Sequence, residues 1–313
     1  MLSRTADSLY WTARYMERAD FTARILDATT RLASLPASRG YSGDPWASAL
    51  ESSGAAAAYY AKHAVADERT VRRFLAFDTE NPSSIRCCLE HARTNARSVR
   101  TALTVELWEA INRAWIDLKA FEATAHDREA FASFLDWVKS VSLAFDGAAY
   151  RTMLRNDAYW FLRIGDQIER ADNTARLLDV KYHLLLPEDE EVGGGLDYFQ
   201  WTTLLREVSA LTAYRWVYRE TIRSWLVADL LILNRQMPRS LASCQAEIVS
   251  CLDLLASAYG RRGIAQRQAT HTLDRLSACT IESLFQSGLH EFISGFLAEN
   301  NRLGAAISEQ YLQ

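Results

Sequence analysis

The sequence contains one charged segment twice: residues 17–27 read ERADFTARILD and residues 169–179 read ERADNTARLLD. Nine of the eleven positions are identical, and the two copies lie 152 residues apart. Both copies space their apolar residues at intervals of three and four, which is typical of one face of an α-helix. The repeat therefore predicts two long and similar helices, one in each half of the chain.

A second, weaker repeat lies further along each half. FDTENPSSIRCC at 77–88 resembles LNRQMPRSLASC at 233–244, with an offset of 156 residues. Because the two offsets nearly agree, we infer a single domain, 1–313, made of two similar halves, roughly 1–150 and 151–313. The halves are expected to meet near 145–155 and to pack about an approximate two-fold axis. Pro82 and Pro238 are expected in the first turn of a helix, where a missing N–H costs nothing.

Helical spacing continues through most of the chain, and no segment alternates as a strand would. Glycine and proline are scarce, with 13 and 5 residues among 313. The sequence therefore predicts an all-α fold, a multi-helix bundle. The expected helices cover 5–34, 65–78, 82–101, 103–124, 127–146, 157–186, 198–233, 238–259, 264–278 and 280–311. The segments 32–46 and 186–198 have the proline, glycine and acidic content of exposed loops.

Composition excludes several classes of protein. With 313 residues, 49% of them hydrophobic, the chain can bury a substantial core. A net charge of −4 gives no broad cationic field and argues against a nucleic-acid partner. Five cysteines without a C-x-x-C pair suggest neither a disulfide framework nor a zinc site. The N-terminus lacks a secretion signal, and the most apolar run, 225–233, is too short to span a membrane. We expect a cytoplasmic protein with no membrane partner.

On a helix, the charged residues of each repeated segment fall into one stripe with apolar residues on both sides. A helix that is apolar nearly all round belongs in an interior, where charges need partners. Ala13 and Gly165, one turn before each glutamate, leave room for a facing helix or a ligand. The first stripe consists of Glu17, Asp20, Arg24, Asp27 and Arg31. The second stripe consists of Glu169, Asp172, Arg176, Asp179 and His183.

Three interpretations of the stripes remain open. The charges could form a solvated face laced with pairs such as Asp20–Arg24 and Asp172–Arg176, each contributing only about 0.2–0.5 kcal/mol. They could form a buried and chemically inert polar contact between the two halves. They could also line a functional pocket. Glu17 and Asp20 are like charges three residues apart, which a purely stabilising surface pattern would avoid, so the first interpretation is disfavoured.

The order and spacing of several motifs resemble the bacterial alpha-E family over nearly the whole chain. The motifs are RYMERADFTARILD at 14–27, NPSSIRCCLEHARTNARSVR at 81–100, ELWEAIN at 106–112, GDQIERADNTARLLD at 165–179, VADLLILNRQMPRSLASC at 227–244, GLHEFI at 288–293 and NRLGAAI at 301–307. The family is all-helical and named for its helices and a characteristic glutamate. The resemblance implies that its Glu-Arg pairs fall on Glu17-Arg18 and Glu169-Arg170. It also implies partnership with circularly permuted ATP-grasp proteins and transglutaminase-like proteins in peptide or amide-bond synthesis or modification.

Two classes of function follow. In the first, the chain is an accessory partner that docks on an ATP-grasp ligase. No cofactor motif is identified, so ATP and Mg²⁺ would be supplied through that ligase. In the second, the chain is itself an enzyme of amide modification, with Glu17 or Glu169 as general base. Its arginines, Arg24, Arg170 and Arg176, would then hold a carboxylate or acyl phosphate. The first class is favoured, because a catalytic pair would more often be asymmetric than duplicated.

Further candidates lie outside the stripes. Arg93 and Arg97 share one helical side and are expected either to supply cations to the acidic stripe, to grip an anionic ligand, or to form a solvated basic face. The segments NPSS at 81–84 and MPRS at 237–240 could present free N–H groups to a phosphate or carboxylate, although plain helix capping explains most such sequences. No metal ligands are assigned. The chain contains no Glu-x-x-His motif, so a di-iron site is not expected, whereas magnesium held mainly by a substrate's phosphates stays open because that ion needs only one or two protein carboxylates.

Overall fold

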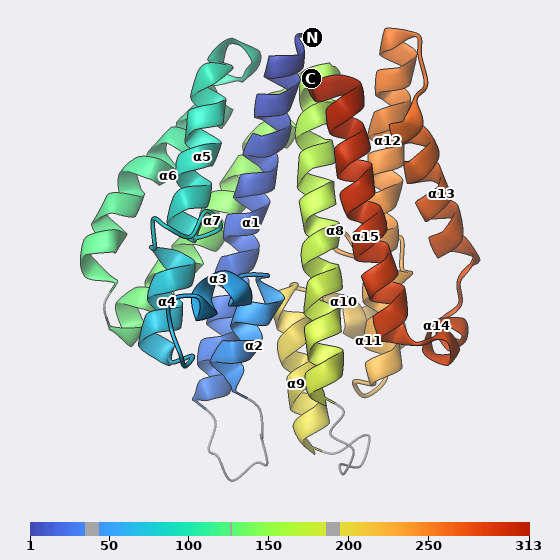
Figure 1. Ribbon diagram of the computed structural model, residues 1–313. Helices are drawn as coiled ribbons and strands as arrows, with labels where there is room; N and C mark the ends of the chain where they lie inside the picture. Colours follow the sequence, from blue (N-terminus) through green and yellow to red (C-terminus); the bar gives the residue numbers. More distant parts are fainter. Residues whose placement is uncertain (35–43, 126, 186–194) are drawn as a thin grey trace.

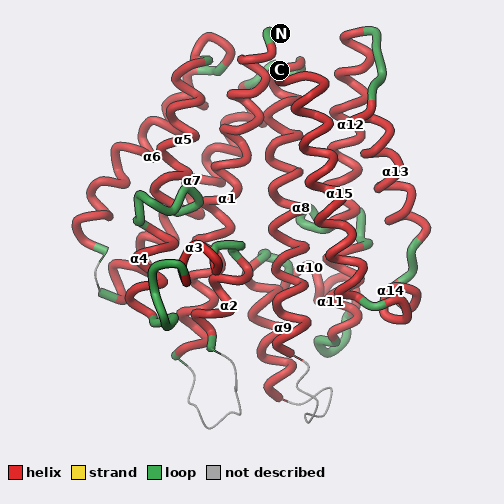
Figure 2. The backbone as a smooth tube through the Cα atoms, in the orientation of Figure 1, coloured by secondary structure: helices red, strands yellow, loops and turns green. Residues whose placement is uncertain are grey.

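The computed structural model describes residues 1–34, 44–125, 127–185 and 195–313, with the side chains of 181–185 and 195–197 left out. Within these residues the fold is all-helical, without strands, as predicted (Figure 2). Two long helices, α1 (Ser3–Ala33) and α8 (Asp157–Leu185), lie side by side in the middle, and the two chain ends meet at one end of the molecule (Figure 1). These are the two helices that the repeated segment predicts.

Each central helix is packed by helices from its own half of the chain. Against α1 lie α5 (Ile85–Ser98) and α7 (Arg128–Thr152), and α6 (Val105–Thr124) packs on both of these. Against α8 lie α12 (Leu241–Tyr259) and α15 (Leu289–Ile307), and α13 (Ile264–Ala278) packs on both. The core therefore consists of two helical groups that meet where α1 contacts α8 (Figure 1).

Shorter helices cross between the two groups. Helix α2 (Pro45–Ser52) follows α1 in the chain and contacts α8 as well as α1, whereas α9 (Gly195–Glu207) follows α8 and contacts α1 as well as α8. The other short elements are α3 (Ala56–Tyr60), α4 (Glu68–Ala76), η2 (Arg100–Ala102), α10 (Leu211–Tyr218), α11 (Ser224–Ile232), α14 (Ile281–Ser287) and the π-helical turn η3 (Ser308–Leu312). Because α2 and α9 each also contact the central helix of the other group, they connect the two groups.

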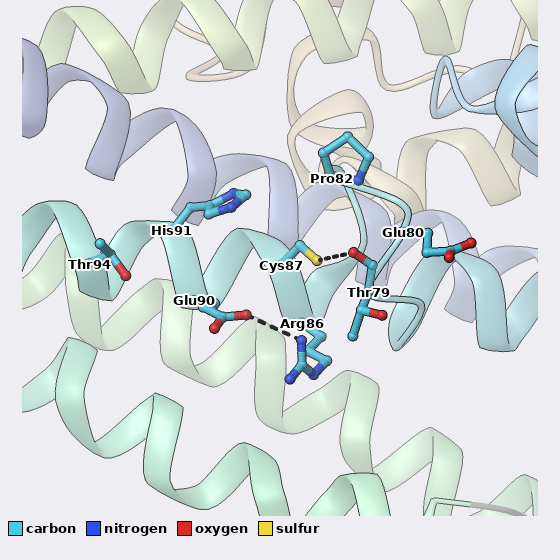
Figure 3. Close-up of a pocket in the computed structure, with 8 residues that line it drawn as sticks. All are labelled: Thr79, Glu80, Pro82, Arg86, Cys87, Glu90, His91 and Thr94. Atoms are coloured by element: carbon cyan, nitrogen blue, oxygen red, sulfur yellow. Dashed lines mark hydrogen bonds and ion pairs between the residues drawn. The ribbon is translucent and has the colours of Figure 1, made fainter.

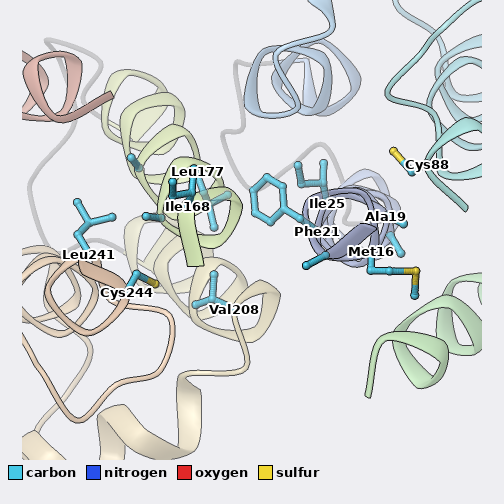
Figure 4. Close-up of a cluster of buried hydrophobic side chains, with 14 of the residues drawn as sticks. Met16, Ala19, Phe21, Ile25, Cys88, Ile168, Leu177, Val208, Leu241 and Cys244 are labelled. Atoms are coloured by element: carbon cyan, nitrogen blue, oxygen red, sulfur yellow. The ribbon is translucent and has the colours of Figure 1, made fainter. Parts of the chain in front are cut away.

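Apolar side chains fill the space between the central helices. Phe21 and Ile25 of α1 point toward α8 (Figure 4), and both are buried. Cys88 and Cys244, which the second repeat aligns, are both buried. Cys88 lies on the side of α1 that faces away from α8, and Cys244 lies on the side of α8 that faces away from α1 (Figure 4). Burial raises the pKa of each thiol to about 12, so both cysteines act as packing residues at neutral pH.

Some helix boundaries differ from the predicted ones. The expected helix 198–233 is three helices, because Ser209 and Arg219 adopt left-handed backbone conformations with φ of 56° and 54°. The expected helix 280–311 is interrupted at Gly288, whose φ is 93°. Helices α2 and α3 were not predicted. The expected loops 32–46 and 186–198 fall mostly outside the described residues.

The two aligned prolines were predicted one turn too far into their helices. Ser84 and Ser240 are the N-caps, and their hydroxyl groups accept hydrogen bonds from the backbone N–H of Cys87 and Ser243. Pro82 and Pro238 therefore lie in the turn before each helix. Capping by a serine hydroxyl satisfies one free N–H group in each first turn.

Helix α12 is the one described helix that is long and apolar enough to cross a membrane by length and composition. Half of it is buried inside the protein, where it packs against α8 and α13. One such helix is weak evidence for a membrane span.

Candidate functional site: a buried glutamate–arginine network

The backbones of α1 and α8 approach one another closely at Gly165. A Cβ atom placed on Gly165 would lie 2.2 Å from the carbonyl oxygen of Tyr10, well inside van der Waals contact. Only glycine allows this approach. The space that the sequence predicts beside the glutamates is therefore occupied here by the facing helix.

Beyond this crossing point, each glutamate binds an arginine from the other repeated segment. The Arg170 guanidinium donates to Glu17 at 2.7 Å, and the Arg18 guanidinium donates to Glu169 at 2.5 Å. Glu17 and Glu169 are each only 2% exposed. The two Glu-Arg dipeptides thus exchange partners across the contact between α1 and α8.

A second arginine completes the environment of each carboxylate, and it comes from a different place in each case. Arg239, in the turn before α12, donates to Glu17 and also to Asp20 at 2.8 Å. Arg14 of α1 donates to Glu169 at 2.8 Å. Each buried carboxylate is therefore matched by two guanidinium groups, which is the pairing that buried charge requires.

The network extends outward from Arg170. Arg170 also donates to Asp166 at 2.9 Å, and Arg163 donates to the other oxygen of Asp166 at 2.8 Å. Asp146 of α7 lies 3.5 Å from the Arg170 guanidinium. Acidic and basic side chains therefore alternate from Asp146 on α7 through Arg170 and Asp166 to Arg163 on α8. Because Arg170 also binds Glu17 of α1, the network connects three helices.

The arginines hold both glutamates in the ionised form. Burial alone would raise the pKa of Glu17, but Arg170 and Arg239 outweigh this effect and lower the pKa to about 2. Burial acts in the same direction on Glu169, where Arg14 and Arg18 keep the pKa below its usual value. A general base needs a pKa near the working pH. Neither glutamate has the proton affinity of such a base.

This pairing predicts a specific dependence of stability on pH. The pKa of Glu169 is lower in the folded chain than its usual 4.5, so folding favours the carboxylate. Its contribution to stability is complete above pH 4.5 and is lost as the pH falls toward the folded pKa. Urea unfolding of the wild type and of Glu169→Gln should show a constant stability difference between about pH 7 and 5 that narrows toward about pH 3. A difference that widens as the pH falls contradicts this pairing.

The rest of each stripe runs from the interior toward the surface. Asp20 is buried and accepts from Arg24 at 2.7 Å, whereas the side chain of Arg31 is 60% exposed. Arg176 donates to Asp172 at 2.7 Å in the second stripe. The solvated-face interpretation is therefore wrong at the inner end of the first stripe and holds only at its outer end. His183 lies outside the residues whose side chains are described.

Arg93 and Arg97 do not join the network. Arg93 lies on α5 and donates to Asn112 of α6 at 2.9 Å. Arg97 is exposed at the end of the same helix. Among the residues that the structure describes, neither arginine contacts a carboxylate of the stripes. The suggestion that they supply cations to the stripes is wrong, because the side of α5 that carries them faces α6 and solvent.

A pocket of about 580 Å³ lies beside the NPSS turn (Figure 3). Arg86 points toward Glu90, and the Cys87 thiol points toward the carbonyl oxygen of Thr79. Because Ser84 already accepts from the Cys87 N–H, the first turn of α5 is capped. Helix capping is therefore the interpretation that the geometry supports for this segment, and the same holds for the MPRS turn.

Several members of the network were not among the predicted site residues. Arg14 and Asp166 lie on the repeated helices themselves, one turn before Arg18 and Arg170, and a wider window on the repeat would have included them. Arg239 is 222 residues from Glu17, so no helical spacing could have connected the two. Within the described part of the chain, no group of three or more His, Cys, Asp and Glu side chains is placed to hold a metal ion.

The fold and this network define an all-helical protein whose two central helices are joined by exchanged Glu-Arg pairs. The family model Alpha-E, described as a predicted alpha-helical domain with a conserved ER motif, matches residues 1–312. The chain therefore belongs to the Alpha-E family. No curated protein and no solved structure matches it.

Proposed function

We propose that the chain is an accessory helical partner of an ATP-grasp-type ligase in peptide or amide-bond synthesis or modification. The observation that carries the proposal is the enclosure of both glutamates: each is 2% exposed and is held by two arginines. A carboxylate in this position has no access to a substrate amine and no tendency to accept its proton. The network acts as the polar contact that fixes α1 against α8.

The alternative is that the chain is itself an enzyme that uses Glu17 or Glu169 as a general base. The lowered pKa values of both groups weigh against it. Under the accessory proposal, ATP and Mg²⁺ are bound by the ligase, and a transglutaminase-like protein acts on the same class of amide substrates. We place all three proteins in the cytoplasm, where ATP is available.

We also propose that the two halves descend from an internal duplication and are related by an approximate two-fold axis. The exchanged Glu-Arg pairs and the crossed contacts of α2 and α9 support this proposal. So does a shared turn: Gly54 after α2 and Ser209 after α9 both have positive φ, and the residue that follows each donates its N–H five residues back, at 2.9 and 2.7 Å. Trp46 and Trp201, eight residues before these turns, are both buried.

A surface suited to a protein partner lies on α10 and the start of α11. Trp216 and Trp225 are 75% and 42% exposed, and exposed arginines accompany them at 215, 219 and 223. Tryptophan and arginine are among the residues most enriched at the energetic centres of protein interfaces. The excess of positive charge in this segment favours an acidic face on the ligase.

We expect the double variant Trp216→Ala, Trp225→Ala to bind the ligase at least about tenfold more weakly, because hot-spot tryptophans contribute about 2 kcal/mol or more. Isothermal titration calorimetry with the purified ligase measures the change. Tyr150→Ala on α7 is the control, since Tyr150 is 69% exposed and lies on another helix. Equal affinity of the double variant and the control removes this segment from the interface.

Reconstitution tests the accessory role itself. The chain alone should consume no ATP and form no amide, and the ligase should turn over faster when the chain is added. The Glu169→Gln variant should change the rate of product formation only to the extent that it changes the melting temperature and the affinity for the ligase. If that variant loses product formation while melting and binding stay unchanged, the chain is the enzyme and the accessory proposal fails.

A further inference from the structure

A second pocket, of about 420 Å³, opens at the outer end of the first stripe. It lies between α1, α7 and α9, away from the buried glutamates. Its lining consists of Arg24, Asp27, Ala28, Arg31, Lys139, Leu143, Phe199, Thr203, Arg206, Glu207 and Ser209. The lining thus contains four cationic side chains and two carboxylates, in a chain whose net charge is −4.

Most of these charged side chains pair with other described residues, and Arg206 is the exception. Asp27 accepts from Arg31 at 3.1 Å and from Lys139 at 3.0 Å, and Lys139 also pairs with Asp136. Arg206 is exposed, and its guanidinium makes no hydrogen bond or ion pair with the described residues. A guanidinium presents a planar fork of donors that matches a carboxylate or phosphate. Arg206 is therefore a cation available to a ligand in this pocket.

The backbone beside Arg206 adopts a conformation that ordinarily favours glycine. Ser209 has a φ of 56°, which costs a residue with a side chain roughly 1–2 kcal/mol. The Ser209 hydroxyl accepts from Arg24 at 2.8 Å, and Arg24 also donates to the Glu207 carbonyl oxygen at 3.4 Å. Backbone strain of this kind is often found at binding sites. Here the strained residue, Ser209, accepts the hydrogen bond that orients the Arg24 guanidinium at the pocket wall.

The corresponding position in the first half is built differently. When Trp46 is aligned with Trp201, Gly54 matches Ser209 and Glu51 matches Arg206. In the turn after α2 the positive φ therefore falls on a glycine, Gly54, which adopts it without strain. At the position of Arg206 the first half has an acidic residue, Glu51. The cationic pocket is thus a feature of the turn after α9 and not a necessary consequence of the fold.

Part of the pocket wall is apolar. Leu143 of α7 is 67% exposed, and Phe199 of α9, which also lines the pocket, is partly buried. An exposed leucine next to cations can cover the apolar part of a ligand whose charged end pairs with arginine. The pocket volume is within the range of sites for small molecules.

We propose that this pocket binds a small oxyanion that carries an apolar group, either a carboxylate or a phosphate ester, with Arg206 and Arg24 at the charged end and Leu143 and Phe199 at the apolar end. The proposal goes beyond the accessory role and does not depend on the ATP-grasp partner. It assigns a ligand to a part of the molecule that the glutamate network does not use.

Isothermal titration calorimetry with three probes tests the proposal on the full chain. N-acetylphenylalanine provides a carboxylate, phenyl phosphate provides a phosphate ester, and N-acetylphenylalaninamide lacks the charge. At least one oxyanion should bind with a dissociation constant of about 1 mM or tighter, and the amide should bind at least about tenfold more weakly. The oxyanion that binds more tightly shows whether the pocket prefers a carboxylate or a phosphate ester. If neither oxyanion saturates the chain, or the amide binds as well as the acid, the proposal is wrong.

Matched variants locate the binding. Arg206→Gln should weaken the tighter oxyanion at least about tenfold, since it removes a charged hydrogen-bond partner. Arg97→Gln removes the same charge from the exposed end of α5 and should leave the affinity unchanged. Both variants should melt as the wild type does. Equal affinity in the two variants, or an equal loss in both, contradicts the assignment to this pocket.

Discussion

Replacing Gly165 with alanine should destabilise the protein by about 3 kcal/mol or more, or prevent folding. The added methyl group would lie 2.2 Å from the Tyr10 carbonyl oxygen, and this oxygen belongs to the backbone of α1 and cannot rotate away. Overpacking of a close contact typically costs 1–3 kcal/mol, and the cost is larger where the structure cannot relax. Chemical unfolding monitored by tryptophan fluorescence measures the loss.

Gly147→Ala is the matched control for this prediction. Gly147 also lies within a long helix, α7, but apart from its own helical turn no described heavy atom lies within 4 Å of the position that its Cβ would take. Alanine at this position should stabilise the protein by about 0.5–1 kcal/mol, which is the helix-propensity difference between the two residues. If the two variants shift stability in the same direction, the backbones of α1 and α8 do not meet at Gly165.

The second large effect is expected from Glu169→Gln. This change leaves the shape of the side chain nearly intact but removes the charge that Arg14 and Arg18 share. Removing one partner of a buried ion pair typically costs 3–5 kcal/mol, because the remaining charge stays buried without compensation. We expect about 3 kcal/mol, since the two arginine side chains are 16% and 25% exposed and water screens them in part.

Glu109→Gln is the control for this prediction, because Glu109 is exposed on α6. Its effect should stay within about 0.5 kcal/mol, as is usual for surface substitutions. Equal stability of Glu169→Gln and Glu109→Gln would show that Glu169 is not an essential charge of the interior.

The fold class and the buried ends of the stripes could be predicted from sequence because they depend on local periodicity. The spacing of apolar residues around Glu17 and Glu169 surrounds each charge with apolar surface, and this favours enclosure over a solvated face. The repeat also pointed to Gly165 as a small residue beside the second glutamate. The sequence left a facing helix or a ligand as alternatives for the space beside it, and the structure shows the facing helix.

Other features depend on contacts that local spacing does not encode. Ser209 and Arg219 end helices by adopting positive φ, and neither residue is a glycine that would have signalled it. Arg239 reaches Glu17 from a distant part of the chain. Arg93 faces α6 because of how α5 is rotated against α1, and a helical wheel does not determine that rotation. The sequence therefore predicts which two central helices carry the network. Tertiary packing determines which arginine pairs with which carboxylate.

We assign different roles to the two ends of the first charged stripe. At its inner end, Glu17 is enclosed and its pKa is about 2, so it contributes to the association of α1 with α8. At its outer end, the stripe contributes Arg24 and Arg31 to an open pocket. Chemistry or recognition should therefore depend on the outer end, and stability on the inner end.

A double-mutant cycle on Glu169 and Arg18 tests the central claim most directly, because these residues lie on α8 and α1 and are joined by the hydrogen bond of 2.5 Å. The cycle compares the free energies of unfolding of the wild type, Glu169→Gln, Arg18→Gln and the double variant. The account predicts a coupling energy of about 2 kcal/mol, within the range for residues in direct contact. A coupling energy near zero, with the single effects simply additive, would contradict the claim that exchanged Glu-Arg pairs hold the two central helices together.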